Sequence, residues 1–270
     1  PRAGPAGFQW ELSVPVFGSR LGEFRGDLPG QLLRLQPHRT GAKAEDPPFE
    51  LHRIAQLDHM AHGRFLWGIG AGAYVGDCEV FGYDPSTEEN RKMFRDTIDV
   101  ILKIWQDPDP GVYEKWNWSF KVPEPLESAG LRLHLKPYQK PHPPIAVGGV
   151  SPYSSTLALA GERGWIPMSI NVVPTRVLKT HWEAVERGAS TTGLTPNRAE
   201  WRICRDVYVA ETTEQAREEA LEGVLTRDFQ RYFLPLFADR NLTSLAKENP
   251  DMPDSDLTAE YLMDNIWVVG

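Results

Sequence analysis

The sequence lacks the features that mark several classes of protein. Its 270 residues contain no run of about 18 apolar residues, the minimum for a membrane-spanning helix. It has only two cysteines, Cys78 and Cys204, too few and too far apart to suggest a disulfide framework. Its formal net charge of −8 argues against general nucleic-acid binding, and its first 30 residues lack the apolar segment of a signal peptide. We therefore expect a cytoplasmic protein with no nucleic-acid or membrane partner.

The first 50 residues differ in composition from the rest of the chain. They are rich in glycine, proline and arginine, and their only strand-like run, residues 14–17, is interrupted by Pro15. From residue 51 onward, apolar residues recur with the spacing of helices and strands. We expect residues 1–50 to form an irregular segment and residues 51–270 to form one α/β domain.

Strand and helix signals alternate through this domain. Continuous apolar strands are expected at residues 64–70, 144–149, 165–170, 202–210 and 265–270. One helix is expected to end at Gly63. Four further helices are expected to begin beside Ser86, Ser151, Pro174 and Thr212. Between two of these helices, residues 112–143 predict a long loop with a short hairpin near Trp116. Continuous apolar strands alternating with helices indicate a parallel sheet, either closed as a barrel or open and doubly wound.

The details of two of these helices are also predicted. With Ser151 as the N-cap, Pro152 takes the first helical position and the helix runs to about Arg163. The helix that begins beside Thr212 is expected to run without a break through Phe229.

Residues 68–73 read Gly-Ile-Gly-Ala-Gly-Ala and match the dinucleotide-binding fingerprint. That fingerprint requires a helix to begin at once, so that its N–H groups face a pyrophosphate. Here an Asp-Pro pair and further glycines precede the next helix, which disfavours a nicotinamide site. The glycines could instead permit a tight turn, or let the backbone approach a planar or phosphorylated ligand.

Residues 147–155 read Val-Gly-Gly-Val-Ser-Pro-Tyr-Ser-Ser, where a strand leads directly into a helix. Backbone N–H groups, hydroxyls and the positive end of the helix dipole converge there, as a phosphate monoester requires. An ordinary capped helix has the same composition, so this motif alone leaves both interpretations open. His59 and His62 have a spacing that could ligate a metal, but no carboxylate or cysteine pattern accompanies them, and we expect no metal site.

Several of these motifs together resemble the luciferase-like flavin-dependent monooxygenases, and in particular their limonene-monooxygenase-like branch. The motifs occur in the family's order at residues 63–82, 136–145, 147–154, 160–165 and 264–270. The resemblance implies a TIM-type (β/α)8 barrel with reduced FMN at the C-terminal ends of the strands. It also implies that the flavin reacts with O2 to form a hydroperoxide, which inserts one oxygen atom into an apolar organic substrate. A separate flavin reductase and a homodimer are expected.

The resemblance also implies a set of cofactor-binding residues. Gly70, Ala71, Gly72 and Tyr74 are expected beside the flavin, Gly149, Val150, Ser151 and Ser154 around its phosphate, and Ser169 and Asn171 at the border of the isoalloxazine ring. At the position of Ala71 the luciferases have a basic residue that helps to bind phosphate. Its absence makes the phosphate more dependent on the helix N-terminus.

Two parts of the family pattern are missing from this sequence. The family's first strands, with a histidine that aids catalysis, should precede Ile54, and a final strand–helix unit should follow Gly270. We therefore expect a barrel that is incomplete at both ends, and we assign no catalytic residue. Three alternatives remain: a deazaflavin-dependent oxidoreductase of the same fold, an inactive remnant that binds no flavin, and a nicotinamide dehydrogenase on an open sheet.

Overall fold

A parallel sheet forms the centre of the structure, a computed structural model that describes residues 31–33, 47–72, 88–116, 118–131 and 136–270. Its strands follow the order β1-β2-β5-β6-β7, and every neighbouring pair is parallel. In a doubly wound sheet, the chain starts in the middle of the sheet and later returns to add strands on the other side. Here each strand lies beside the one that precedes it in the sequence, as in the wall of a barrel. The strands are β1 (Gln31–Leu33), β2 (Phe65–Ile69), β5 (Ile145–Gly149), β6 (Ile166–Ser169) and β7 (Arg202–Ile203).

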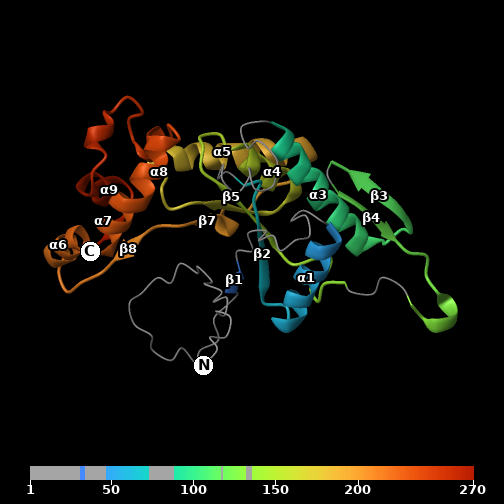
Figure 1. The fold of residues 1–270 in the computed structure, drawn as a ribbon. Coiled ribbons are helices and arrows are strands. Elements are labelled where there is room, and N and C mark those ends of the chain that lie inside the picture. Colours follow the sequence, from blue (N-terminus) through green and yellow to red (C-terminus); the bar gives the residue numbers. More distant parts are fainter. Residues whose placement is uncertain (1–30, 34–46, 73–87, 117, 132–135) are drawn as a thin grey trace, which may run out of the picture.

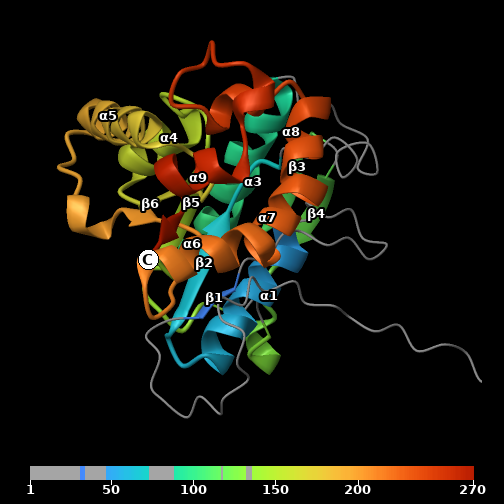
Figure 2. The same cartoon turned by 90° about the vertical axis from the view of Figure 1, so that its left-hand side faces the viewer.

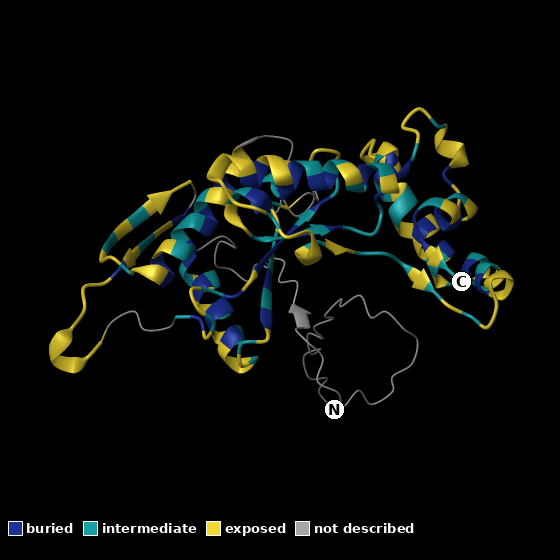
Figure 3. Ribbon diagram, turned by 180° about the vertical axis from the view of Figure 1, so that it is seen from behind, coloured by how far each residue is buried: buried dark blue, intermediate teal, exposed yellow. Residues whose placement is uncertain are grey.

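Helices cover one face of this sheet (Figure 1). They are α1 (Pro47–Met60), α3 (Glu88–Gln106), α4 (Ser155–Arg163) and α5 (Thr175–Thr192). Trp67 of β2 and Val147 of β5 are buried in one cluster with Ile101 of α3. The buried sides of these helices face the strands, and their exposed sides face outward (Figure 3). Helices on one face and strands in sequential order give the α/β architecture of a TIM-type barrel wall.

Most predicted helix ends are confirmed, and each is explained by the backbone conformation of a residue at that end. Gly63 ends α1 with a φ of 75°, and Gly164 ends α4 with a φ of 67°. Both glycines adopt the left-handed conformation that other residues disfavour. Pro174 precedes α5 as predicted. The predicted cap at Ser86 lies outside the described residues.

The predicted start of α4 is wrong. Ser154, not Ser151, is its N-cap, and the helix begins at Ser155. Tyr153 has a φ of 52°, in the left-handed region, so Pro152 cannot be the first residue of a continuous helix. Residues 150–154, which we call the phosphate turn, therefore form a separate turn between β5 and α4.

The excursion between α3 and β5 contains the predicted hairpin. Strands β3 (Gly111–Lys115) and β4 (Trp118–Val122) pair antiparallel, and Asn117 between them lies outside the described residues. The hairpin and the short helix η1 (Glu127–Ala129) project from one end of the molecule (Figure 1).

The C-terminal part of the chain gathers at the other end of the molecule as a group of short helices (Figures 1 and 2). The strand predicted over residues 202–210 is divided into β7 and β8 (Val207–Tyr208), and β8 pairs parallel with β9 (Val268–Val269). The strand predicted to start at residue 265 is shorter than expected, because Asn265 still belongs to a helix. The remaining elements are η2 (Arg198–Glu200), α6 (Thr213–Glu222), α7 (Val224–Asp228), the π-helix η3 (Phe229–Phe233), α8 (Leu234–Asp239), η4 (Thr243–Ala246), η5 (Asp254–Asp256) and α9 (Ala259–Asn265).

The long helix predicted from Thr212 to Phe229 is also broken. Thr212 caps α6 by accepting from the Gln215 N–H, as predicted, but α6 stops before Gly223. Gly223 has an extended backbone, with φ of −90° and ψ of −162°, and a Cβ there would collide with the Glu219 carbonyl, so this conformation requires glycine. The break lets α7 and η3 turn inward, and Phe229 and Trp267 meet edge to face at 6.2 Å between ring centroids.

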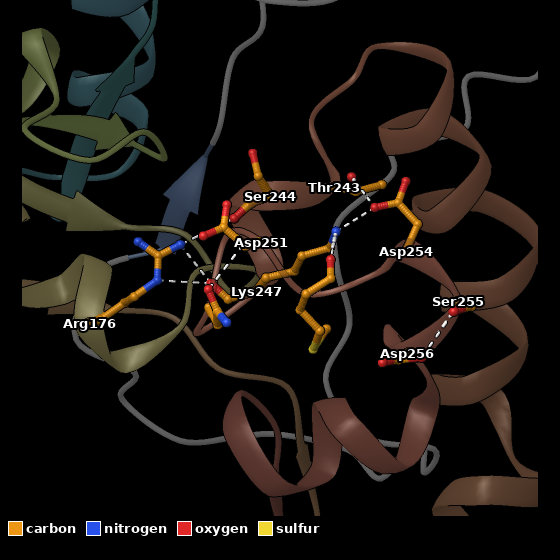
Figure 4. A network of polar contacts seen from close by, with 10 residues as sticks. Arg176, Thr243, Ser244, Lys247, Asp251, Asp254, Ser255 and Asp256 are labelled. Atoms are coloured by element: carbon orange, nitrogen blue, oxygen red, sulfur yellow. Dashed lines mark hydrogen bonds and ion pairs between the residues drawn. The ribbon is translucent and has the colours of Figure 1, made fainter.

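A polar network ties these helices to the start of α5 (Figure 4). The Arg176 guanidinium donates to the carbonyls of Lys247 and Ser244. The Lys247 side chain is buried, and its ammonium group donates to the Met252 carbonyl and forms an ion pair with Asp254. The segment from Thr243 to Asp254 is therefore held from two directions.

Two predictions from the sequence, on membrane-spanning helices and on disulfides, can be compared with the structure. None of the helices in the described ranges is long and apolar enough to cross a membrane. Cys204 forms no disulfide with a described residue, and Cys78 lies outside these residues. The cytoplasmic location stays a prediction.

Candidate flavin site

Small residues line the face of the sheet that the helices do not cover. Trp67 and Val147 point into the helix layer, so the alternation of strand side chains turns Gly68, Ala146 and Gly148 to the opposite face. Among the described residues, no atom lies within 4 Å of a Cβ built on Gly68, Gly70 or Gly148. These glycines are therefore not required by close packing of the described chain. They leave room for a flat group beside the backbone, near the C-terminal ends of β2 and β5.

The phosphate turn begins directly after β5 and ends at the N-cap of α4. Its Ser154 Oγ accepts from the Leu157 N–H at 3.4 Å, and the Ala158 N–H bonds to the Ser154 carbonyl at 3.0 Å. The N–H groups of Ser155 and Thr156 belong to the first turn and have no intrahelical acceptor. Together with the helix dipole they form a site suited to an anion.

Ser154 acts as a cap in this structure rather than as an open hydroxyl. Its Oγ lies 2.9 Å from Thr156 Oγ1, which donates its own hydrogen to the Gly148 carbonyl at 2.7 Å. Ser154 must therefore donate its hydrogen to Thr156. Ser151, in contrast, is exposed on the same turn. The phosphate contacts predicted for Ser151 and Ser154 both stay predictions.

Gly149 contributes to this turn through close packing. A Cβ there would lie 2.5 Å from Leu157 Cγ and 2.9 Å from Ser154 Oγ. The absence of a side chain lets α4 begin immediately above the end of β5. The adjacent Val150 is half-buried.

Ser169, predicted to border the flavin ring, points into the helix layer and has no exposed surface. Its Oγ lies 2.8 Å from His181 Nδ1 and accepts from Trp201 Nε1 at 2.9 Å. The other ring nitrogen of His181 lies 3.1 Å from the Ser151 carbonyl oxygen. The structure thus links Ser169 to the phosphate turn through His181 and leaves its side chain no surface to offer a ligand.

Asn171 follows the C-terminal end of β6 and is half-buried. Its Nδ2 donates to both carboxylate oxygens of Asp206, at 3.0 and 2.9 Å. Burial raises the pKa of Asp206 above its ordinary value, against the hydrogen bond from Asn171, and the nearby Asp228 raises it further. A neutral Asp206 side chain could donate as well as accept a hydrogen bond.

Asp206 also lines a cavity of about 40 Å³. Its wall is apolar except for Asp206 and Asp228, and it consists of Val172, Leu225, Phe229, Phe233, Phe237, Ala246, Leu262, Ile266 and Trp267. Because Asn171 and Val172 are adjacent, the cavity adjoins the segment that was predicted to border the flavin. The π-helix η3 contributes Phe229 and Phe233 to the wall of this cavity. Such helices often occur at functional sites.

The remaining predicted residues lie at the end of β2. Gly70 and Gly72 are exposed, Ala71 is half-buried, and Gly72 has a φ of 76°. Tyr74 lies outside the described residues. A nicotinamide fingerprint needs a helix that begins near Gly72. The residues that would form its first turns, 73–87, also lie outside the described ranges.

His59 and His62, whose spacing could ligate a metal, both contact the side chain of Tyr138. Both pack edge to face against that ring, and His59 Nε2 lies 2.9 Å from the Lys136 carbonyl oxygen. Within the described part of the chain, no group of three metal-ligating side chains comes together.

His181 and Asp206 are two residues that the sequence interpretation missed. His181 lies four residues from both Val177 and Val185 on the buried face of α5. A histidine in the middle of an apolar helix face is a signal, because a buried imidazole needs partners for both nitrogens. Asp206 lies between Arg205 and Val207, directly before β8, and its partly buried carboxylate also needs donors.

Comparison with known proteins identifies the fold and the family. The model of the luciferase-like monooxygenase family matches residues 51–270. The chain belongs to this family. The luciferase-like monooxygenases include 3,6-diketocamphane 1,6-monooxygenase of Pseudomonas putida, which is 29% identical over 88% of this chain and 65% of its own length. Limonene 1,2-monooxygenase of Rhodococcus erythropolis is 30% identical over 64% of this chain and 42% of its own length.

A solved structure shows the same relationship. The oxygenating constituent of 3,6-diketocamphane monooxygenase from Pseudomonas putida, described as a type II Baeyer–Villiger monooxygenase in complex with FMN, superposes with a TM-score of 0.73 at 30% identity. The match covers 90% of this chain and 64% of that one. This luciferase-like chain therefore spans slightly less than two thirds of the length of the diketocamphane monooxygenase relatives and 42% of the limonene monooxygenase. The predicted family and fold class are confirmed.

Proposed function

We propose that this chain binds FMN at the C-terminal ends of β2, β5 and β6, and that the protein is an FMN-dependent monooxygenase acting on an apolar organic substrate. The observation that carries the proposal is the pairing of two features at one sheet edge. Open glycines, Gly70 and Gly148, leave room beside the backbone, and the first-turn N–H groups of α4 offer an anion site next to them. A relative of the same family is described in complex with FMN.

On this proposal, different residues of the chain bind the phosphate group and the ring system of the flavin. The N–H groups of Ser155 and Thr156, with the Ser151 hydroxyl, hold the phosphate, while Gly70 and Gly148 admit the ring system. We propose that Asn171, which follows β6, contacts the ring edge. Reduced FMN, when bound, activates O2 so that one oxygen atom is transferred to the substrate and the other leaves as water.

The cavity beside Asn171 has a mostly apolar wall, but its volume of about 40 Å³ has room for a few water molecules and not for an organic substrate, so the apolar substrate is proposed from the relatives alone. A reactive oxygen species is lost to hydrogen peroxide when water reaches it, so the proposed reaction requires a flavin site from which water is excluded. The relatives named for diketocamphane and limonene suggest a compact carbon framework with few polar atoms. The Asp-Pro pair and further glycines that follow residues 68–73 in the sequence disfavour a nicotinamide site and favour a separate reductase as the source of reduced FMN. A homodimer stays a prediction.

Flavin titration tests the binding half of the proposal. Oxidised FMN should lose fluorescence on addition of the protein, and Gly148→Val should weaken binding at least about tenfold by filling the open space. Gly148→Val should leave the thermal unfolding midpoint nearly unchanged, because no described atom occupies that space. If FMN fluorescence does not respond to the wild-type protein, the chain is a remnant that binds no flavin.

Oxygen uptake tests the reaction. With FMN, NADH and an unrelated flavin reductase, the protein should couple O2 consumption to oxygenation of a terpene or cyclic ketone, detected by mass spectrometry with 18O2. Incorporation of one 18O atom per product is the expected result. Product formation under anaerobic conditions with a reduced deazaflavin would instead assign the chain to hydride transfer.

A further inference from the structure

His181 has a position that its sequence context does not explain. It lies on α5, has no exposed surface, and uses both ring nitrogens. One nitrogen reaches Ser169 at the end of β6, and the other reaches the carbonyl of Ser151 in the phosphate turn. The imidazole therefore joins three separate elements behind the candidate anion site.

The hydrogen bonds fix the tautomer of His181. A backbone carbonyl can only accept, so Nε2 carries the hydrogen that is donated to Ser151. In a neutral ring Nδ1 then accepts, and Ser169 donates its hydroxyl hydrogen to it. The lone pairs of Ser169 Oγ remain available to accept from Trp201 Nε1. Burial lowers the pKa of His181 below its ordinary value, which agrees with a neutral ring.

The far end of this chain of donors is also held in place. Trp201 stacks on Trp182 with 5.6 Å between ring centroids, and the Arg198 guanidinium lies over both rings. The donor direction therefore runs from a fixed indole through Ser169 and His181 to the Ser151 carbonyl. Each member has one orientation that satisfies its neighbours.

The phosphate turn receives a second contact from the same helix. The Tyr153 N–H donates to Thr180 Oγ1 at 3.1 Å, and Thr180 directly precedes His181. With the bond from Arg187 to the Tyr153 carbonyl at 3.4 Å, helix α5 thus holds two carbonyls and one N–H of a turn whose Tyr153 is in the left-handed region. A turn with a strained residue keeps its conformation only when its surroundings determine it.

We propose that His181, supported by Ser169 and Trp201, is a positioning residue that sets the phosphate turn for the phosphate group of FMN. This inference rests on the proposed function. Without the imidazole, the Ser151 carbonyl loses its donor, and rotation of the Ser151–Pro152 peptide can bring its oxygen into competition with a phosphate. His181 does not touch the flavin itself.

Comparison of FMN with riboflavin tests the proposal, because riboflavin lacks the phosphate. The variant His181→Phe removes both ring nitrogens at similar volume. It should weaken FMN binding about tenfold, as expected for the loss of a buried hydrogen bond, while riboflavin binding changes less than about twofold. His181→Gln keeps an N–H donor and should restore part of the FMN affinity. Binding is measured by quenching of flavin fluorescence.

A matched control separates positioning from stability. Thr226→Val removes a different buried hydrogen bond, from Thr226 Oγ1 to the Ala220 carbonyl at 2.9 Å, far from the turn in the C-terminal helices. This variant should lower stability without changing the ratio of riboflavin to FMN dissociation constants. If His181→Phe does not fold, Ser169→Ala interrupts the same donor chain with a smaller change and should shift the ratio in the same direction.

The outcomes are distinguishable. Equal loss of FMN and riboflavin affinity in the His181 and Ser169 variants would show a general structural role and overturn this inference, while the proposed function would stand. Equal affinity of the wild-type protein for both flavins would show that the turn does not hold a phosphate. In that case this inference and the proposed phosphate site both fail.

Discussion

Gly188 of α5 lies directly against the backbone carbonyl of Ala158 in α4. A Cβ at Gly188 would overlap that oxygen, and a Cβ at Gly161 of α4 would overlap the carbonyl of Val185 in return. The two helices therefore approach each other at a pair of reciprocal glycines. Because α4 begins at the phosphate turn and α5 carries His181, this crossing fixes the distance between the candidate anion site and the residue that holds it.

Gly188→Ala should be strongly destabilising, because the obstructing atoms belong to backbone that cannot move aside. Overpacking in a core costs about 1–3 kcal/mol and more where the backbone must shift. Urea unfolding measures the loss. Gly68→Ala is the matched control, since no described atom lies within 4 Å of its Cβ, and its stability should stay within about 1 kcal/mol of the wild type. Equal stability of the two variants would contradict the close helix crossing.

The parts of the fold that were predictable from the sequence have local causes. Gly63 and Gly164 end helices through their own backbone conformation, and the apolar run that became β5 is buried because every residue in it is apolar or small. The start of α4 was not predictable, because Ser151, Ser154 and Ser155 are all capable caps. The choice between them depends on Tyr153, a residue type that rarely adopts a positive φ.

The candidate site was predictable only in part. The glycines and serines of the phosphate turn are contiguous in sequence, and the family resemblance points to them. The role of Ser169 depends on His181 and Trp201, which are 12 and 32 residues away from it. Contacts of this kind arise from tertiary packing, and no local spacing encodes them.

Two serines of the phosphate turn should respond differently to substitution by alanine. Ser154→Ala removes the N-cap of α4 and should cost about 1 kcal/mol of stability in chemical denaturation. Ser151→Ala alters an exposed hydroxyl and should change stability by less than about 0.5 kcal/mol, while weakening FMN binding. The reverse order of stability would mean that the helix begins at Ser151 after all.

The ion pair between Lys247 and Asp254 should be asymmetric in its response to mutation (Figure 4). The Lys247 side chain is 4% exposed, whereas that of Asp254 is 61% exposed. Asp254→Ala leaves a buried ammonium group with the Met252 carbonyl as its remaining partner, whereas Lys247→Met leaves a carboxylate that water can solvate. Asp254→Ala should therefore lower the thermal midpoint more than Lys247→Met does. A larger effect of Lys247→Met in differential scanning calorimetry would show that packing of the lysine stem dominates.

Asp206 should make the stability of the protein depend on pH in a defined direction. Burial raises the pKa of its carboxyl in the folded state, so between the unfolded value, about 3.9, and the raised folded value the folded chain binds more protons than the unfolded chain. Stability should therefore fall as pH rises through this window. Asp206→Asn removes the penalty, keeps one oxygen to accept from Asn171, and should raise the thermal midpoint at pH 7.

The same substitution should have little effect at about pH 3, where the carboxyl group is protonated in both states. Thermal unfolding of both proteins from pH 3 to pH 7 gives the difference directly, and Asp228→Asn serves as a comparison because Asp228 lines the same cavity. A midpoint for Asp206→Asn that stays below that of the wild type at pH 7 would show that the ionised carboxylate is stabilised by its donors. In that case Asp206 would be an acceptor for its donors, Asn171 and Trp267, and could not donate a hydrogen bond into the cavity.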